Sequence, residues 1–199
     1  MVKLTFHPHT LTAALHAGSH AARTTADTDG HGVAITAQPD GSLRIHSDTG
    51  ADFSRAYADP APDTDPGADP QPAAVITLHA AASFRRHLTR CGPQDSVELR
   101  ITPHAVTLIK NGWLNLAAAS NKAPTLSPWA YRDLPTADLA TEIPSHLHPA
   151  RDQLHTDLAT HAHPDPDSTL EVYPQAHDPH ALVWHLGDWA LGLTHTPSR

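Results

Sequence analysis

Alternating apolar and polar residues divide the chain into three stretches that repeat one order of elements. Residues 2–57, 73–119 and 139–196 each predict a short strand, a helix and then strands joined by tight turns. A repeated unit of this kind buries its apolar face by packing against other copies of itself. The pattern therefore predicts an α+β fold of β-α-β-β-β units, in which antiparallel sheets carry helices on one face.

In the first unit, residues 2–7 alternate as a strand that Pro8 ends, and Thr10 is placed to cap a helix that reaches about Arg23. Helical spacing gives this helix an apolar stripe of Leu11, Ala14, Leu15, Gly18 and Ala22. The same spacing turns four residues outward, namely Ala13, His16, Ala17 and His20. Three strands are predicted to follow, at 31–38, 42–48 and 52–57.

In the second unit, a strand is predicted at 74–79 and a helix from about 80 to 90. At about 100° per residue, Arg86 and Arg90 lie on the outer face of this helix and Arg85 lies at its flank. The opposite face is apolar and consists of Ala81, Phe84, Leu88 and Cys91, with the cysteine as a small buried residue. Strands are predicted to follow at 97–102, 105–110 and 113–118.

In the third unit, residues 140–143 are expected to open as a strand, and Ser145 is expected to cap a helix that reaches about Ala162. Leu147, Leu154 and Leu158 line its apolar face, whereas its outer face is neutral, with Gln153, Thr156 and Thr160. Strands are predicted at 169–173, 182–186 and 189–193.

Residues 59–72 interrupt the pattern with 4 Asp and 5 Pro and leave almost nothing to bury. This composition is typical of a disordered acidic linker. The chain is therefore expected to hold a first domain, residues 1–135, of two units joined by this linker. Residues 136–199 would then form a half-domain made of the third unit.

The overall composition limits the class of protein. A formal charge of −8 argues against attraction of the whole surface to nucleic acid or anionic lipid, although a local basic surface is compatible with it. No apolar run is long enough to span a bilayer and no signal peptide is visible, so no membrane partner is expected. The chain has 1 Cys, which excludes an internal disulfide and a multi-cysteine zinc site. The cytoplasm is the simplest compartment.

The sequence offers no active site. The 18 histidines reflect a compositional bias, and pairs such as His16 and His20 lack the third ligand of a recognised metal motif. No Gly-x-Ser-x-Gly elbow or glycine-rich phosphate loop is present. We therefore expect no catalytic residue, no cofactor and no metal, and we expect that the protein is not an enzyme. A histidine-rich metal-binding or hydrolytic protein stays open as an alternative.

The helix that carries Arg85, Arg86 and Arg90 is the one local electrostatic feature. An outward cationic face can follow phosphates through contacts that do not depend on base sequence. An ordinary solvated helix face explains the same charges equally simply.

The order of these elements resembles the bacterial DNA sliding clamp, the beta subunit of the replicative polymerase. Lys3-Leu4-Thr5-Phe6 with the helix after it is similar to the opening of that family, and residues 75–78, the helix from Ala80 and residues 95–120 resemble the second half of a clamp domain. Residues 131–135 fall where such domains end in an acidic connector that contains proline. The resemblance covers residues 2–135.

The resemblance implies a function as a clamp-like processivity or tethering factor. In that family the helices line a hole and face duplex DNA, while the sheets form the rim and pair edge to edge between subunits. Carried over by position, Arg86 and Arg90, with Arg85 beside them, would contact duplex DNA without sequence specificity. The expected partners are duplex DNA, a DNA polymerase or other replication proteins, and further copies of the chain in a homo-oligomer.

Two features depart from the family. Only the second of the three helices is basic, and the chain has three units where a family member usually carries six. The odd unit needs a partner, so a shortened clamp is one interpretation. The other is a clamp-fold adaptor or inhibitor that binds replication proteins through sheet edges without encircling DNA.

Overall fold

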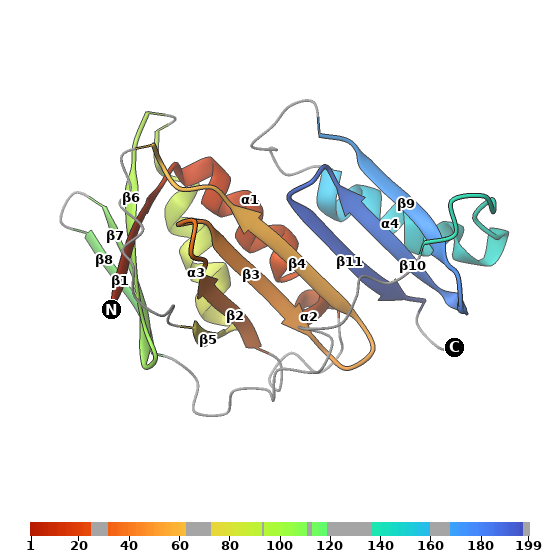
Figure 1. The fold of residues 1–199 in the computed structure, drawn as a ribbon, viewed down its shortest axis with the longest axis horizontal. Helices are drawn as coiled ribbons and strands as arrows, with labels where there is room; N and C mark the ends of the chain where they lie inside the picture. Colours follow the sequence, from red (N-terminus) through yellow and green to blue (C-terminus); the bar gives the residue numbers. More distant parts are fainter. Residues whose placement is uncertain are drawn as a thin grey trace.

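Two antiparallel sheets hold the strands of all three units (Figure 1). The structure is a computed structural model that describes residues 1–24, 32–62, 73–92, 94–110, 113–118, 137–159 and 168–196. The four-stranded sheet has the order β1-β6-β7-β8 and the seven-stranded sheet has the order β5-β2-β3-β4-β11-β10-β9. The predicted α+β class and the antiparallel pairing are thus confirmed.

The element bounds follow the sequence pattern closely. The strands are β1 (Val2–Phe6), β2 (Gly32–Ala37), β3 (Leu43–Asp48), β4 (Phe53–Ala58), β5 (Ala73–Thr77), β6 (Val97–Thr102), β7 (Ala105–Lys110), β8 (Trp113–Ala118), β9 (Leu170–Gln175), β10 (Asp178–Leu186) and β11 (Ala190–His195). The helices are α1 (Pro8–Gly18), α2 (His20–Thr24), α3 (Leu78–Leu88), the short 3-10 helix η2 (Ser145–Leu147) and α4 (His148–Ala159). None of the described helices is long and apolar enough to cross a membrane.

The first two units exchange their opening strands. Strand β1 pairs with β6 of the second unit, with Leu4 opposite Leu99. Strand β5 pairs with β2 of the first unit, with Ala74 opposite Ile35. Each unit therefore completes the sheet of the other. The expected boundary at residue 135 lies outside the described residues and stays a prediction, as does a disordered linker at 59–72, of which only residues 59–62 are described.

The third unit extends the sheet of the first. Strand β11 pairs antiparallel with β4, and Gly192 lies opposite Ser54. A Cβ atom at Gly192 would lie 2.4 Å from the Trp184 ring and 2.5 Å from the Phe53 carbonyl oxygen. Glycine is therefore required where β11 approaches β4 under the tryptophan. Nothing in the local pattern of residues 189–193 predicts this contact.

All three units share one hydrophobic core. Its largest side chains include Phe6, Phe84 and Trp184, one from each unit, and each is at most 1% exposed. A smaller cluster on the opposite face of the sheet joins Phe53 of β4 to Ala181, Val183 and Leu193. The seam between the first and third units is thus apolar on both faces. We conclude that the third unit is part of the packed fold.

The first helix is interrupted, whereas the pattern predicts one helix to Arg23. Helix α1 begins at Pro8, which occupies the first turn where its missing N–H costs nothing, and ends before Ser19. The amide N–H groups of Ala21 and Ala22 at the start of α2 donate to the hydroxyls of Ser54 and Ser47 at 3.0 and 3.1 Å. Side chains from β4 and β3 therefore cap the second helix, which sequence spacing within the helix cannot reveal.

The expected opening strand at 140–143 is wrong. The Asp138 carboxylate accepts hydrogen bonds from the Ala140 amide at 3.1 Å and the Thr141 hydroxyl at 2.6 Å, so residues 139–141 form a turn. Local side-chain hydrogen bonds of this kind compete with strand pairing. Only a single bridge, between Ala137 and Gln175, remains where the other units place an opening strand.

Candidate nucleic-acid interface

Helix α3 carries the predicted basic face. The Thr77 hydroxyl caps its first turn by accepting the Ala80 N–H at 3.2 Å. Ala81, Phe84 and Leu88 bury its apolar side as the spacing predicts, and Cys91 is half-buried against the same core. Arg86 and Arg90 are both exposed, Arg86 on the helix and Arg90 in the turn after it. Both guanidinium groups can reach an external phosphate.

Arg85 has a different environment from the other two arginines. Its side chain is half-buried, and its Nε atom is fully buried without a hydrogen-bond partner. Burial and then the charge of Arg23 lower the pKa of Arg85 to about 10, against the opposing effect of Asp157. Arg85 therefore belongs to a junction where α2, α3 and α4 of the three units meet.

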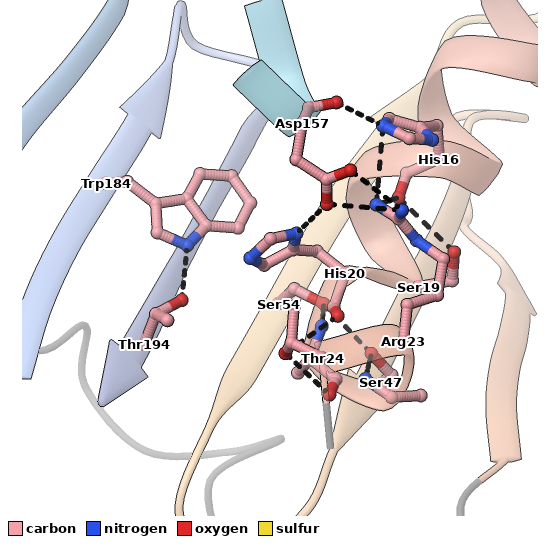
Figure 2. Close-up of polar contacts among 12 residues, drawn as sticks. His16, Ser19, His20, Arg23, Thr24, Ser47, Ser54, Asp157, Trp184 and Thr194 are labelled. Carbon is pink, nitrogen blue, oxygen red and sulfur yellow. Dashed lines mark hydrogen bonds and ion pairs between the residues drawn. The ribbon is translucent and has the colours of Figure 1, made fainter. Parts of the chain in front are cut away.

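Asp157 of α4 is the centre of this junction (Figure 2). Its carboxylate lies 3.1 Å from His20 Nδ1, and it accepts from Arg23 Nη1, 3.2 Å from the nearer oxygen. Its backbone carbonyl lies 2.7 Å from His16 Nε2. One residue of the third unit thus contacts three residues of the first, all of them on α1 or α2.

The contacts of Asp157 determine the protons on both histidines. A carbonyl oxygen can only accept, so His16 carries its proton on Nε2. His20 donates from Nδ1 to the carboxylate, and its ring packs edge-on against Trp184 at 5.6 Å between ring centres. The hydrogen bond from His20, followed by the charge of Arg23, holds the pKa of Asp157 well below its usual range. The carboxylate therefore stays ionised across the neutral range.

The expected outward face of the first helix is wrong. Four of its residues, which spacing alone turns outward, are at most 4% exposed: Ala13, His16, Ala17 and His20. The third unit contacts this face through Asp157 and Trp184. In the third unit, Leu147 at the end of η2 and Leu154 and Leu158 on α4 are buried as predicted. Gln153 and Thr156 are exposed as predicted, while Thr160 lies outside the described residues.

A second polar contact joins the third unit to the first where β11 pairs with β4. His195 on β11 places Nδ1 3.0 Å from Asp52 Oδ1 and Nε2 3.1 Å from Asp178 Oδ2. An imidazole that donates from both nitrogens is an imidazolium. The Asp52 hydrogen bond, with Asp178, accordingly raises the pKa of His195 despite its partial burial.

An open cleft of about 780 Å³ lies between the first and third units, at the strand ends. Its lining is aromatic and acidic and includes Tyr57, Trp189, Asp59, Glu171 and Asp188. None of the described residues that line it is Lys or Arg. This acidic lining would repel phosphate, so the cleft and the arginine helix are surfaces of opposite charge.

The structure brings together residues that sequence analysis did not connect. Arg85, predicted beside the DNA-facing pair, lies close enough to Arg23 and Asp157 for their charges to shift its pKa, and the sequence singled out neither of those two for a role. The only sequence signal for this junction is that Arg23 and Asp157 are charged residues on helices that also carry histidines. Within the described part of the chain, no group of three or more His, Cys, Asp or Glu side chains is placed to hold a metal ion.

Comparison with known proteins places this geometry in a recognised fold. No family model matches the sequence, and no curated protein matches it either. Among solved structures, the whole chain aligns with the DNA polymerase III beta subunit of Pseudomonas aeruginosa at 10% identity and a TM-score of 0.69, covering 67% of that chain. It also aligns with the beta subunit of Thermotoga maritima at 9% identity and a TM-score of 0.66, covering 65% of that chain.

A sliding clamp from Bartonella birtlesii aligns over the whole chain at 8% identity and a TM-score of 0.60, covering 66% of that clamp. The chain thus spans about two thirds of the length of the clamps that it matches. Identities this low establish architecture alone. The exchanged opening strands, the packed helices and these alignments together show that the chain has the fold of the bacterial DNA sliding clamps.

Proposed function

We propose that this protein is a clamp-like DNA processivity or tethering factor that acts without catalysis. The observation that carries the proposal is a pair of exposed arginines in a clamp fold, Arg86 on α3 and Arg90 in the turn that follows it. Arg85 lies beside them and would contribute its positive charge from a half-buried position. The proposed ligand is the phosphate backbone of duplex DNA.

The chemistry of two guanidinium groups at the C-terminal end of α3 suits weak contacts with phosphates. Such contacts release counterions and fix no base sequence, so they permit sliding and weaken steeply with salt. A net charge of −8 does not oppose this, because the acidic cleft and the arginine helix are separate surfaces. Retention on DNA would then depend on topology more than on affinity.

We further propose that the chain works as a homo-oligomer in the cytoplasm, together with a DNA polymerase or another replication protein. Residues 1–135 would act as one clamp-like domain, and residues 136–199 as a half-domain that adds to its sheet. One copy is shorter than the matched clamps, which are about half as long again. Several copies would have to close around the DNA.

A charge-reversal variant tests the arginine helix. Arg86→Glu with Arg90→Glu should abolish the association with duplex DNA, because two attractive contacts become repulsive, while the unfolding temperature stays the same. Arg100→Glu, on β6 and paired with Glu98, is the matched control and should leave association unchanged. Electrophoretic mobility shift at two salt concentrations provides the measurement. Unchanged affinity in the double variant would contradict the proposal.

A second candidate is a clamp-fold adaptor or inhibitor that binds replication proteins without encircling DNA. The pairing of β11 with β4 favours it, because the edge of β4 is already occupied within the chain and cannot pair with another subunit. Retention on circular but not on linear DNA distinguishes the two functions. A stable monomer in solution, measured by mass, would support the adaptor and rule out a ring.

A further inference from the structure

Four polar side chains form a square on the helix-free face of the seven-stranded sheet. Strand alternation turns Leu43 and Ile45 into the core, so Arg44 and His46 point to the opposite face. In the register with β4, Arg44 lies opposite Tyr57 and His46 lies opposite Arg55. We call Arg44, His46, Arg55 and Tyr57 the sheet-face quartet. Figure 1 views the sheet from this side.

The two arginines of the quartet lack an ion-pair partner in the described part of the chain. Among the described residues, neither forms an ion pair, and the Nε atom of each is buried without a hydrogen-bond partner. Arg55 does lie over the Tyr57 ring at 5.6 Å. The nearest carboxylate on β3, Asp48, accepts instead from the Gly50 amide at 2.7 Å. Asp48 Oδ2 is buried without a partner on the same face, diagonal to Arg55, yet it pairs with neither arginine. Two half-buried, unpaired cations therefore occupy diagonal corners of the quartet.

His46 is a buried side chain of this face whose hydrogen-bonding groups lack partners. Its side chain is 3% exposed, yet neither ring nitrogen has a hydrogen-bond partner. Burial, and then the charges of Arg44 and Arg55, lower the pKa of His46 to about 4. On β2 its cross-strand neighbour is the uncharged Ala34, so the charge that faces His46 across the strands is that of Arg55 on β4. Leu191 of β11 lies on the other side of Arg55 and is equally uncharged. Buried unpartnered polar groups of this kind require an explanation.

We propose that the sheet-face quartet binds an acidic segment of a partner protein, whose carboxylates bridge Arg44 and Arg55. Guanidinium groups hold carboxylates with two parallel hydrogen bonds, which makes such pairs strong and directional. An added negative charge would also offset the repulsion between the two arginines and make a proton on His46 favourable. The site is separate from the arginine helix, so it extends the proposed function to a protein partner.

The spacing of the quartet favours an extended segment as the occupant. Diagonal positions on neighbouring antiparallel strands lie about 7–8 Å apart. Alternate residues of an extended peptide lie about 6.6 Å apart on one side. Two acidic residues separated by one position can therefore reach both arginines at once. A flat sheet face lacks the enclosure that a small free anion needs for tight binding.

Titration with a labelled peptide of alternating Asp and Thr tests the proposal. Fluorescence anisotropy should report binding to the full chain that a peptide of alternating Asn and Thr does not reproduce. Arg44→Gln and Arg55→Gln should each weaken binding about tenfold, because each removes a charged hydrogen-bonded pair. Arg100→Gln, an arginine of the other sheet, is the matched control and should change nothing. Equal weakening by the control, or no binding at all, would overturn the proposal.

Three further measurements separate the occupants. Proton NMR of His46 should show its pKa rising when the acidic peptide is bound, which a purely structural histidine would not do. Competition by inorganic phosphate at equal concentration would indicate a small-anion site and overturn the assignment of a protein segment. Binding seen only after Asp63, Asp65 and Asp69 are changed to Asn would identify the chain's own acidic linker as the occupant and overturn the partner.

Lysine variants test the same contact if the glutamine variants fail to fold. Arg44→Lys and Arg55→Lys keep the charge and lose the planar fork, so they should retain the fold and bind with intermediate affinity. Equal unfolding temperatures in all variants confirm that only the surface changed. Lysine variants that bind as tightly as the natural chain would contradict bidentate recognition of carboxylates and overturn the proposed contact.

Discussion

Helices α1 and α3 occupy equivalent places in their units but meet different surroundings. The polar side of α1, with α2, is covered by the third unit, and His16 and His20 are 3% and 1% exposed. The corresponding side of α3 remains open, so Arg86 and Arg90 face solvent. The comparison teaches that the third unit selects which helix of the first two stays available for a ligand.

The chemistry of the two helices fits this difference. The covered helix carries alanine and histidine, which tolerate burial once their nitrogens find partners. The open helix carries arginines, which are costly to bury unless paired. Arg85 lies between these cases and shows the cost, since burial and Arg23 both lower its pKa.

Gly192→Ala should weaken the packing of the third unit against α1 and β4. The added Cβ would meet both the Trp184 ring and the Phe53 carbonyl, well inside contact distance. We expect a loss of about 3 kcal/mol in the free energy of unfolding, the upper range for overpacking a core. Thermal denaturation measures it. Gly92→Ala, where a Cβ has ordinary space, is the control, and an equal effect there would refute the steric cause.

Asp157→Asn should weaken the same contact from the helix side. The change leaves Arg23 and the buried His20 without their shared counter-charge, and we expect a cost of about 2 kcal/mol. Urea denaturation of the variant, compared with Asp152→Asn on the exposed side of α4, provides the measurement.

In the natural chain the depressed pKa of Asp157 predicts stability that is present above pH 3.8 and lost as the pH falls further.

His195→Gln should remove an alkaline loss of stability. The raised pKa of His195 means that its contribution is full below pH 6.5 and disappears as the pH rises through the folded-state pKa. We expect the natural chain to lose about 1 kcal/mol across this interval. The free energy of unfolding, measured at several pH values, should be flatter in the variant. His104→Gln, in an exposed turn, should keep the natural slope.

Arg86→Ala and Arg90→Ala should have the smallest effect on stability. Both side chains are exposed, so each change should alter the free energy of unfolding by no more than about 0.5 kcal/mol. Differential scanning calorimetry provides the test. A loss in the free energy of unfolding as large as that of Asp157→Asn would show that the arginine side chains of α3 are packed against other groups.

Much of the architecture was predictable because its signals are local. The strands and the hairpin turns follow from alternation and turn chemistry, and the buried face of α3 follows from helical spacing. The break at Ser19 was not predictable, because its caps are serines that lie on β3 and β4. The missing strand at 140–143 reflects hydrogen bonds of Asp138 that outweigh a weak strand pattern.

The candidate site was predictable only in part. Arg86 and Arg90 follow from charge and helical spacing on one element. The junction around Asp157 does not, because Asp157 lies more than 130 positions from His16, His20 and Arg23 in the chain. The same holds for His195 and Asp52.

Residue type and spacing along the chain are enough to specify the repeated units, their order and the basic face of the second helix. These depend on residue type and short-range spacing, which act within a single strand or helix. The tertiary structure alone decided that the third unit pairs with β4, covers α1 and leaves α3 free. Burial depends on which distant surface arrives, and here that choice rests on the close approach at Gly192 and on the charges around Asp157 and His195.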